Sequence, residues 1–206
     1  ELEILQKIIS SLEKAENVRS IDFIEDDRMD YVKSLQLLTD KPVLYVCNVN
    51  ENAAAKGNAY VEKVKVAISK EKSEVLVLAV NIEADINELE SYEERCLFLE
   101  DIGLKEPGSA KLIRSTYNLL SLQTYFTAGE KEVRAWTIPK GVFAPEAAGV
   151  IHSDFEKGFI RAEVIAYADF KALGSEQKVK EAGKVRSEGK GYIVQDGDVI
   201  NFKFNV

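Results

Sequence analysis

The chain of 206 residues is 46% hydrophobic, which suits one large domain or two small ones with real cores and argues against wholesale disorder. Its formal net charge of -8 lies in residues 1–122, which hold 15 Lys and Arg against 23 Asp and Glu, whereas residues 123–206 hold 12 of each. Bulk charge therefore does not favour nucleic-acid binding, no apolar run approaches the ~20 residues of a membrane helix, and the first residues lack the features of a signal peptide.

Residues 1–16 have the spacing of an amphipathic helix. Leu2, Leu5, Ile9 and Leu12 follow one another at intervals of 3, 4 and 3 residues, which is the spacing of a coiled-coil seam. A helix this short is marginal alone, so we expect it to pack against a partner helix. Because the seam starts at the first residue with no capping residue before it, we expect the chain to be a piece of a longer protein.

Between residues 26 and 121 the pattern alternates between helices and strands. A helix is predicted over 26–40, with Asp26 or Asp27 as its N-cap. Tyr31, Leu35 and Leu38 recur along it at helical spacing. The elements that follow are expected at 43–47 (strand), 58–69 (amphipathic helix), 74–80 (strand), 85–104 (helix capped by Gly103) and 108–122 (helix with Ser109 as a possible N-cap).

Both predicted strands are short apolar runs, which is typical of buried strands in a parallel α/β sheet. Two strands are too few for a sheet with covered faces, so we expect the others to precede this sequence. Val43, Tyr45, Val75 and Val77 should then be less covered than such residues usually are. The open strand edges should favour self-association.

After residue 122 the pattern becomes richer in strands. A hairpin is predicted around Ala128-Gly129-Glu130 and a second around Asp196-Gly197. Between them we expect a helix before Gly158, a half-buried strand over 160–167 and a polar, helix-leaning stretch over 176–190. This order, β-β-α-β-(short helix)-β-β, indicates an α+β roll with one helix across a mixed sheet, and the boundary should fall near residues 120–123.

The stretch "PVLYVCNVNE", from Pro42 to Glu51, ends a buried strand in polar residues. Ligands of open α/β sheets bind at the carboxyl ends of the strands, so Asn48 and Glu51 are candidates for reading a ligand. The alternative is that Asn48 simply ends the strand and Asn50 to Asn52 form an ordinary turn.

The metal-binding residue types are scarce. The single histidine, His152, argues against a multi-histidine metal site, and we expect it to hydrogen-bond to backbone near its helix. Cys47 and Cys96 are far apart in sequence and do not have the spacing of metal ligands. Cys47 lies in an apolar run and should be a buried thiol, in keeping with a reducing, cytoplasmic location.

Three long stretches, "LQTYFTAGEKEVRAWTIPKG", "AAGVIHSDFEKGFIRAEVIAY" and "EAGKVRSEGKGYIVQDGDVINFKFNV", closely resemble the C-terminal domain of the YchF, or Obg-like ATPase, family. That domain is called TGS, after threonyl-tRNA synthetase, GTPases and SpoT, and has a β-grasp, ubiquitin-like fold. The resemblance continues upstream through "LTDKPVLYVCNVNE", "IEADINELE" and "GLKEPGSAKLIRSTYNLL". It implies a remnant of an inserted helical arm (1–25), the C-terminal part of a Rossmann-like P-loop NTPase domain (26–121) and a TGS domain (122–206).

The resemblance also implies a nucleotide-base site. Related GTPases read guanine with Asn-Lys-x-Asp, whereas the YchF family has Asn-x-x-Glu, which stands here as Asn48-Val49-Asn50-Glu51, and favours ATP over GTP. By this resemblance Asn48 orients the base, Val49 packs on it and Glu51 occupies the specificity position. Ala79 and Val80, followed by Asn81, fall in the family's second base-contacting loop; the family usually has small residues there, and Val80 and Asn81 depart from that pattern.

The family's catalytic machinery is not in this sequence, which contains no G-x-x-x-x-G-K-[ST] loop for phosphates. The resemblance implies that the intact protein is an ATPase that uses ATP and Mg²⁺. We expect no catalytic residue and no metal site in this chain, no nucleotide bound to it, and no hydrolysis by it alone.

The resemblance implies the ribosome or ribosomal RNA as partner, and no membrane. The candidate contacts are Lys184, Arg186, Lys190, Arg134 and Arg161, with Lys157 beside them. The alternative is that these are ordinary solvated charges offset by nearby glutamates. A competing interpretation of the whole chain is a stand-alone RNA- or protein-interaction module without nucleotide hydrolysis.

Overall fold

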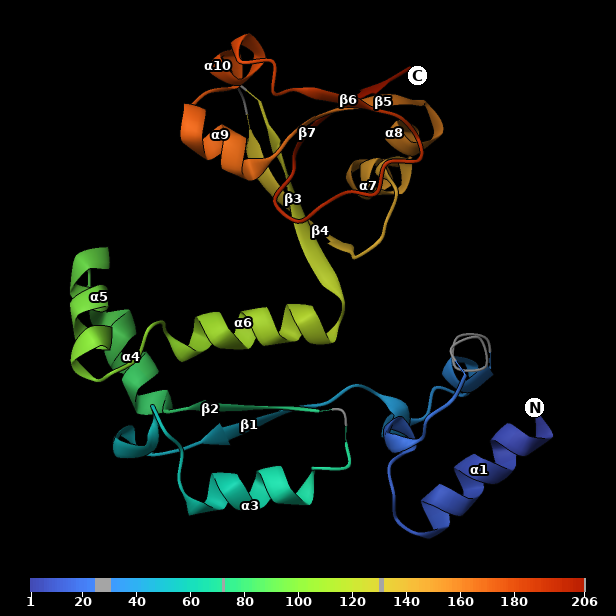
Figure 1. Cartoon of the computed structure of the whole chain (residues 1–206), viewed down its shortest axis with the longest axis vertical. Coiled ribbons are helices and arrows are strands. Elements are labelled where there is room, and N and C mark those ends of the chain that lie inside the picture. Colours follow the sequence, from blue (N-terminus) through green and yellow to red (C-terminus); the bar gives the residue numbers. More distant parts are fainter. Residues whose placement is uncertain (25–30, 72, 130–131, 206) are drawn as a thin grey trace. The chain divides into compact units, whose positions relative to one another are not determined.

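The computed structural model describes residues 1–24, 31–71, 73–129 and 132–205 (Figure 1). The chain divides into two compact units, Glu1–Leu119 and Leu120–Val206, and each is described by itself below. In the ranges that the structure describes, no helix is both long and apolar enough to cross a membrane.

The first unit is built on two parallel strands, β1 (Leu44–Asn48) and β2 (Glu74–Leu78), paired in register from Leu44↔Glu74 to Asn48↔Leu78. The connection between them contains α3 (Ala59–Ala67), which begins where the Asn58 side chain accepts hydrogen bonds from the Tyr60 and Val61 amides. The helices α3 and α6 (Gly108–Leu119) lie on opposite sides of the strand pair (Figure 1). The predicted strands and the amphipathic helix are confirmed, but β1 begins at Leu44 instead of Val43. The strand β2 ends at Leu78, because Ala79 is the N-cap and Val80 the first residue of α4 (Val80–Glu88).

The strand pair is only partly covered within the described chain. Val43, Tyr45, Val75 and Val77 are all half-buried, as predicted. Among the described residues no third strand pairs with β1 or β2. Self-association through these edges stays a prediction.

The N-terminal helix α1 (Leu2–Glu13) buries a different face from the predicted seam. Ile4 and Ile8 pack against Val18 and Val32, because the chain turns back after α1 through the short 3-10 helix η1 (Val18–Ser20). The seam residues Leu2, Ile9 and Leu12 are exposed and Leu5 is half-buried. Within this unit the seam is therefore not the packing face.

The helix predicted over 26–40 is wrong over its second part. Residues 33–40 form two 3-10 turns, η3 (Lys33–Leu35) and η4 (Leu38–Asp40), because Gln36 between them adopts a left-handed conformation with φ of 50°. Leu35 still packs near Ile8, whereas Leu38 is exposed. The proposed caps, Asp26 and Asp27, lie outside the described residues.

The single helix predicted over 85–104 is two helices, α4 (Val80–Glu88) and α5 (Tyr92–Asp101). A capping box divides them: the Ser91 hydroxyl accepts from the Glu94 amide, and the Glu94 carboxylate accepts from the Ser91 amide. At the other end of α5 the predicted cap is confirmed. Gly103 has a φ of 73°, and the Leu104 amide donates to the Leu99 carbonyl at 2.8 Å, as in a Schellman motif.

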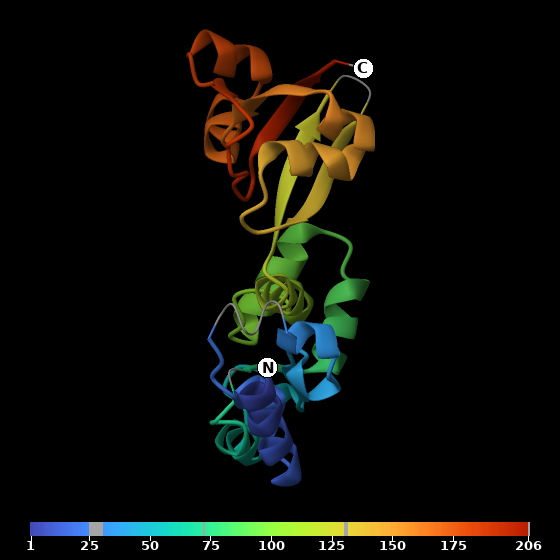
Figure 2. The same cartoon turned by 90° about the vertical axis from the view of Figure 1, so that its right-hand side faces the viewer.

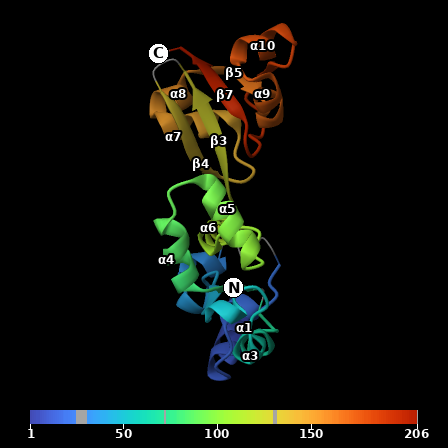
Figure 3. The same cartoon turned by 90° about the vertical axis from the view of Figure 1, so that its left-hand side faces the viewer.

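The second unit is a five-stranded mixed sheet in the order β4-β3-β7-β5-β6. The pairing of β3 with β7 is parallel and the other pairings are antiparallel. Figure 3 shows β4, β3, β7 and β5 side by side. The strands are β3 (Leu122–Ala128), β4 (Val133–Pro139), β5 (Phe159–Ile165), β6 (Arg186–Glu188) and β7 (Val199–Phe204).

Two helices, α7 (Ala144–Ile151) and α8 (Ser153–Lys157), cover one face of this sheet (Figure 2). His152 separates them, and its Nδ1 accepts from the Asp154 amide at 3.2 Å, which confirms the predicted hydrogen bond to backbone near the helix. Tyr125 is fully buried beneath α7 and donates its hydroxyl to the Ala147 carbonyl at 2.9 Å. Burial raises the pKa of Tyr125.

The end of the second unit differs from the prediction. The hairpin expected around Asp196-Gly197 is absent. The residues just before this turn do not form a strand of the sheet, and the strand that precedes β7 in the chain is β6. The turn is tied to β3 instead: the Gly197 amide donates to the Thr124 carbonyl at 2.7 Å, and the Thr124 amide donates to Asp196 at 2.9 Å. The helices α9 (Tyr167–Leu173) and α10 (Glu176–Glu181) lie between β5 and β6, and α9 was not predicted.

Candidate functional site

The carboxyl edge of the strand pair brings two loops together. Asn48 and Leu78 are the last paired residues of β1 and β2, and the Val49 amide extends the ladder by donating to the Leu78 carbonyl at 2.9 Å. The Asn48 Oδ1 accepts a hydrogen bond from the Val80 amide at 3.2 Å. Asn48 therefore joins the end of β1 to the start of α4, which leaves β2 at this edge (Figure 1).

The five residues predicted to contact a base all lie at this edge, but they do not all face solvent. Asn48, Glu51 and Val80 are exposed, and Glu51 begins the short 3-10 helix η5 (Glu51–Ala53). Val49 is half-buried against the apolar cluster that contains Ala79. Ala79 is itself only 3% exposed, so the whole residue is enclosed in this cluster and offers almost no surface to a ligand.

This edge has the chemistry to read a flat heteroaromatic group. Because the Asn48 oxygen is taken by the Val80 amide, both N–H bonds of the Asn48 side chain remain for an acceptor on a ligand. Val49 and Val80 supply apolar surface beside it, and Glu51 supplies an exposed acceptor. Amide donors and apolar side chains in this combination suit a flat ligand group that accepts hydrogen bonds rather than a phosphate or a metal ion.

A further polar contact lies directly behind this edge and was missed from the sequence. The Glu83 carboxylate accepts hydrogen bonds from the amides of Gly108 and Ser109, at 2.6 and 2.8 Å. Glu83, and not Ser109, therefore caps the start of α6. Glu83 and Gly108 are 25 residues apart in sequence, so local sequence spacing could not have predicted this contact.

A second polar cluster fixes β1 from the side. The Glu71 carboxylate accepts from Asn17 at 2.7 Å, from Arg19 at 2.9 Å and from the Tyr45 hydroxyl at 3.1 Å. Burial alone would raise the pKa of Glu71, but the hydrogen bonds from these three side chains outweigh it and hold the pKa below its ordinary value. The cluster ties the segment after α1 to the sheet and has a structural role.

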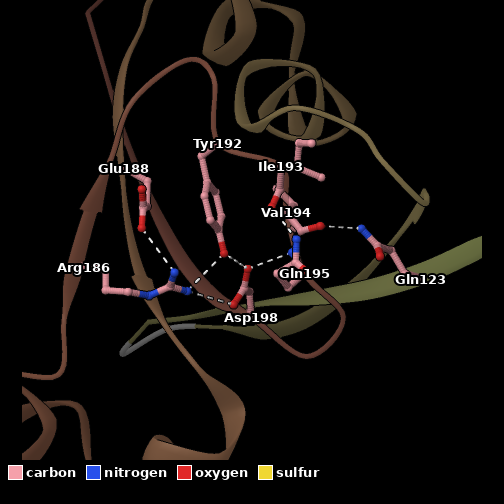
Figure 4. A network of polar contacts seen from close by, with 8 residues as sticks. All are labelled: Gln123, Arg186, Glu188, Tyr192, Ile193, Val194, Gln195 and Asp198. Atoms are coloured by element: carbon pink, nitrogen blue, oxygen red, sulfur yellow. Dashed lines mark hydrogen bonds and ion pairs between the residues drawn. The ribbon is translucent and has the colours of Figure 1, made fainter.

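In the second unit, the candidate Arg186 belongs to a network of polar contacts (Figure 4). Its guanidinium lies 3.2 Å from Glu188, 3.0 Å from the Tyr192 hydroxyl and 3.5 Å from Asp198. The buried Asp198 carboxylate also accepts from the Tyr192 hydroxyl at 2.6 Å and from the Gln195 amide at 2.9 Å. Burial first, and then the hydrogen bond to Asp198, raise the pKa of Tyr192 to about 12.

The other basic candidates are scattered, and most have acidic neighbours. Lys184 lies 3.8 Å from Asp169, and Arg161 lies 3.1 Å from Glu163. The Arg134 guanidinium stacks over the Trp136 ring at 4.0 Å. Lys190 and Lys157 are exposed.

The candidates do not form one patch, because Arg134 is on β4 and Arg186 is on β6. These strands are the opposite edges of a five-stranded sheet, about 19 Å apart at ~4.8 Å per strand spacing.

The described ranges contain no group of three or more His, Cys, Asp or Glu side chains that could hold a metal ion. The two cysteines are free; Cys96 is exposed, and Cys47 is half-buried rather than buried as predicted.

Comparison with known proteins places this geometry in a family. The family model YchF-GTPase_C, described as "Protein of unknown function (DUF933)", matches residues 122–205. The "Ribosome-binding ATPase YchF" of Bacillus subtilis (strain 168) is 54% identical over 208 residues, covering 100% of this chain and 56% of the relative. The protein of the same name from Escherichia coli O157:H7 is 52% identical over 206 residues, with the same coverage. The chain belongs to the YchF family.

A solved YchF structure extends the likeness to three dimensions. The "Structure of the Schizosaccharomyces pombe YchF GTPase" superposes with a TM-score of 0.84 at 35% identity, covering 98% of this chain and 53% of that chain. A GTP binding protein from Pyrococcus horikoshii OT3 shares the fold alone, with a TM-score of 0.57 at 16% identity, covering 90% of this chain and 58% of that one. The chain thus spans about half the length of the YchF proteins that it matches.

Proposed function

We propose that this chain supplies the base-reading edge and the ribosome-binding unit of a YchF-type ATPase. The observation that carries the proposal is the hydrogen bond from the Val80 amide to the Asn48 side chain. It holds the loops after two parallel strands together at the carboxyl edge of the sheet, which is where α/β proteins of this class bind ligands. The names of the curated relatives, which are called ribosome-binding ATPases, support the same activity for the whole protein.

The proposed ligand of the edge is the adenine of ATP. The Asn48 amide would donate to the base, Val49 and Val80 would pack on it, and the enclosed Ala79 would anchor the second loop in the apolar cluster. Glu51 would occupy the position at which guanine-specific relatives carry Asp. Without that Asp, the hydrogen-bond donors of guanine would be left poorly paired in the site, and unpaired polar groups are costly. This supports a preference for ATP over GTP.

The residues present fit the base but not the rest of the nucleotide. The sequence has no Gly-rich phosphate loop, and the described residues have no cluster of carboxylates for Mg²⁺. ATP with Mg²⁺ would supply the phosphoryl chemistry of the whole protein. This chain's own part is to bind and orient the base, and by itself it is expected to hydrolyse no nucleotide.

The second unit is proposed to be a TGS domain of β-grasp type that contacts the ribosome or its RNA in the cytoplasm. Two features support the β-grasp assignment. The last strand, β7, lies between the first and third strands of the unit, β3 and β5, and a layer of helices covers one face of the sheet. Arg186, Lys184 and Arg161 lie within 4 Å of a carboxylate in the same unit. Lys190 is exposed beside the Gly-rich turn that follows β6, which makes it the preferred candidate for an RNA contact.

Replacing Asn48 by alanine is expected to weaken ATP binding about tenfold and to reduce the preference for ATP over GTP. The loss removes the donors to the base and frees the Val80 loop, and each hydrogen bond of this kind contributes about 1 kcal/mol. The measurement is the equilibrium Kd of ATP and of GTP for the protein as its complete gene encodes it.

The matched control is Asn52→Ala, which removes an exposed amide from the same loop. It should leave both affinities within twofold. An unmodified protein that binds GTP as tightly as ATP would contradict the adenine assignment. Equal losses for both nucleotides in Asn48→Ala would reduce Asn48 to a structural role.

Co-sedimentation of this chain with purified ribosomes is expected at low salt and should weaken as salt is raised. Lys190→Glu should lower the affinity about tenfold and reduce the salt slope by about one, because one phosphate contact is lost. Lys171→Glu, which makes the same charge change at an exposed site on α9, is the control. Equal behaviour of the two variants would remove Lys190 from the interface, and failure of the unmodified chain to sediment would contradict ribosome binding by these residues.

A further inference from the structure

The first turn of α4 is held from two directions. At its start, the Val80 amide is bound by Asn48 from the end of β1. One turn later, the Glu83 carboxylate is bound by the Gly108 and Ser109 amides at the start of α6. The loop that carries Ala79, Val80 and Asn81 therefore lies between two fixed points.

The contact of Glu83 with α6 has the features of a built clamp. The first amides of a helix have no partners within the helix, so a carboxylate that accepts from two of them satisfies an unmet requirement. Hydrogen bonds to an ionised carboxylate are also stronger than those between neutral groups. The two short distances, 2.6 and 2.8 Å, show that both carboxylate oxygens are engaged.

Gly108 makes this close approach possible. A Cβ on residue 108 would lie 2.9 Å from the Glu83 Oε1 and 3.0 Å from the Leu78 Cβ, so a larger residue would push the carboxylate or the end of β2 away. The helix α6 packs against both β2 and β1. The clamp therefore fixes the position of α4, through α6, relative to the strand pair that carries Asn48.

We propose that Glu83 is a positioning residue for the base site, which keeps the Ala79–Asn81 loop in register with Asn48 so that the two loops read the base together. The inference rests on the proposed nucleotide function and adds a residue outside the base motif. Glu83 touches no ligand in this scheme and acts through the backbone of α4. A displacement of even about 1 Å in such a supporting contact is enough to weaken recognition.

The alternative is that Glu83 only stabilises the start of α6. A second contact at the same helix start separates the two explanations. Glu106 accepts from Arg114 of α6 at 2.6 and 2.8 Å and has no contact with α4 among its hydrogen bonds. Glu106→Ala therefore perturbs the start of α6 without touching the base loop.

The test compares Glu83→Ala, Glu83→Gln, Gly108→Ala and Glu106→Ala in the protein as its complete gene encodes it. The readouts are the Kd of ATP, the Kd of GTP and the melting temperature. Glu83→Ala should weaken ATP about fivefold and GTP less than twofold, because only base reading is impaired. Gly108→Ala should reproduce this loss with Glu83 still present, and Glu83→Gln, which keeps one acceptor oxygen, should lie in between.

Glu106→Ala should lower the melting temperature while the ratio of the two Kd values stays within twofold of the unmodified protein. If Glu83→Ala lowers the melting temperature but leaves that ratio unchanged, the positioning role is overturned and the proposed function stands. If the unmodified protein shows no preference between ATP and GTP, the proposed adenine site is contradicted, and the positioning role of Glu83 is contradicted with it.

Discussion

Replacing Asp198 by alanine is expected to lower the free energy of unfolding of the Leu120–Val206 unit by about 3 kcal/mol. The Asp198 side chain is only 4% exposed and accepts from the Tyr192 hydroxyl and the Gln195 amide, with the Arg186 guanidinium 3.5 Å away. Its removal leaves the part-buried Tyr192 hydroxyl and Gln195 amide without this acceptor. The same change removes the hydrogen bonds that join the segment 192–195, which runs beside α7 and β3, to the start of β7.

Urea unfolding followed by tryptophan fluorescence measures this loss. Trp136 is the single tryptophan of the sequence and packs against the core of the second unit, so the signal reports on that unit. Asp169→Asn is the control, because Asp169 lies at the surface in a long, 3.8 Å ion pair with Lys184 and should cost less than about 0.5 kcal/mol. A loss below about 1 kcal/mol for Asp198→Ala would show that the network contributes little to stability.

Gly158→Ala is expected to destabilise the same unit by about 3 kcal/mol or more. A Cβ on residue 158 would overlap the backbone carbonyl oxygen of Asn205, and it would lie 2.9 Å from the Asn205 carbonyl carbon. The two backbones are already paired, since the Asn205 amide donates to the Gly158 carbonyl at 2.9 Å. No flexible side chain is available to move aside, so β7 would have to shift.

Gly191→Ala is the matched control, because a Cβ there would meet nothing within 4 Å. It should leave the unfolding midpoint unchanged or raise it slightly by restricting the unfolded chain. The same fluorescence experiment applies to both variants. Equal midpoints for Gly158→Ala and Gly191→Ala would mean that the close approach of β5 and β7 relaxes without cost.

The strands β1 and β2 were predicted from short continuous apolar runs, and the helix α3 from apolar residues at helical spacing. The hairpin of β3 and β4 was predicted from two strand-like runs around a turn signal. The errors lie where a side chain interrupts that spacing. Ser91 and Glu94 restart a helix within an unbroken helical pattern, and the polar strand β6 has no apolar alternation to read.

The candidate site was predictable in its residues but not in its supports. The polar end of β1 pointed to Asn48, and the resemblance to the YchF family supplied the partner loop at Ala79 and Val80. The supports depend on contacts between distant parts of the chain. These are the burial of Ala79, the hydrogen bond from the Val80 amide to Asn48 and the capping of α6 by Glu83. Single positions carry no trace of such contacts. For the same reason Arg186 resembled a free cation in sequence, although its partner Asp198 holds it in place.

The position of β7 sets an order on folding. This strand comes last among the described elements, yet it lies in the middle of the sheet between β3 and β5. Until it is synthesised, the β3–β4 hairpin and the β5–β6 pair have no strand to join them. The second unit is therefore expected to complete its core only after β7 has left the ribosomal exit tunnel.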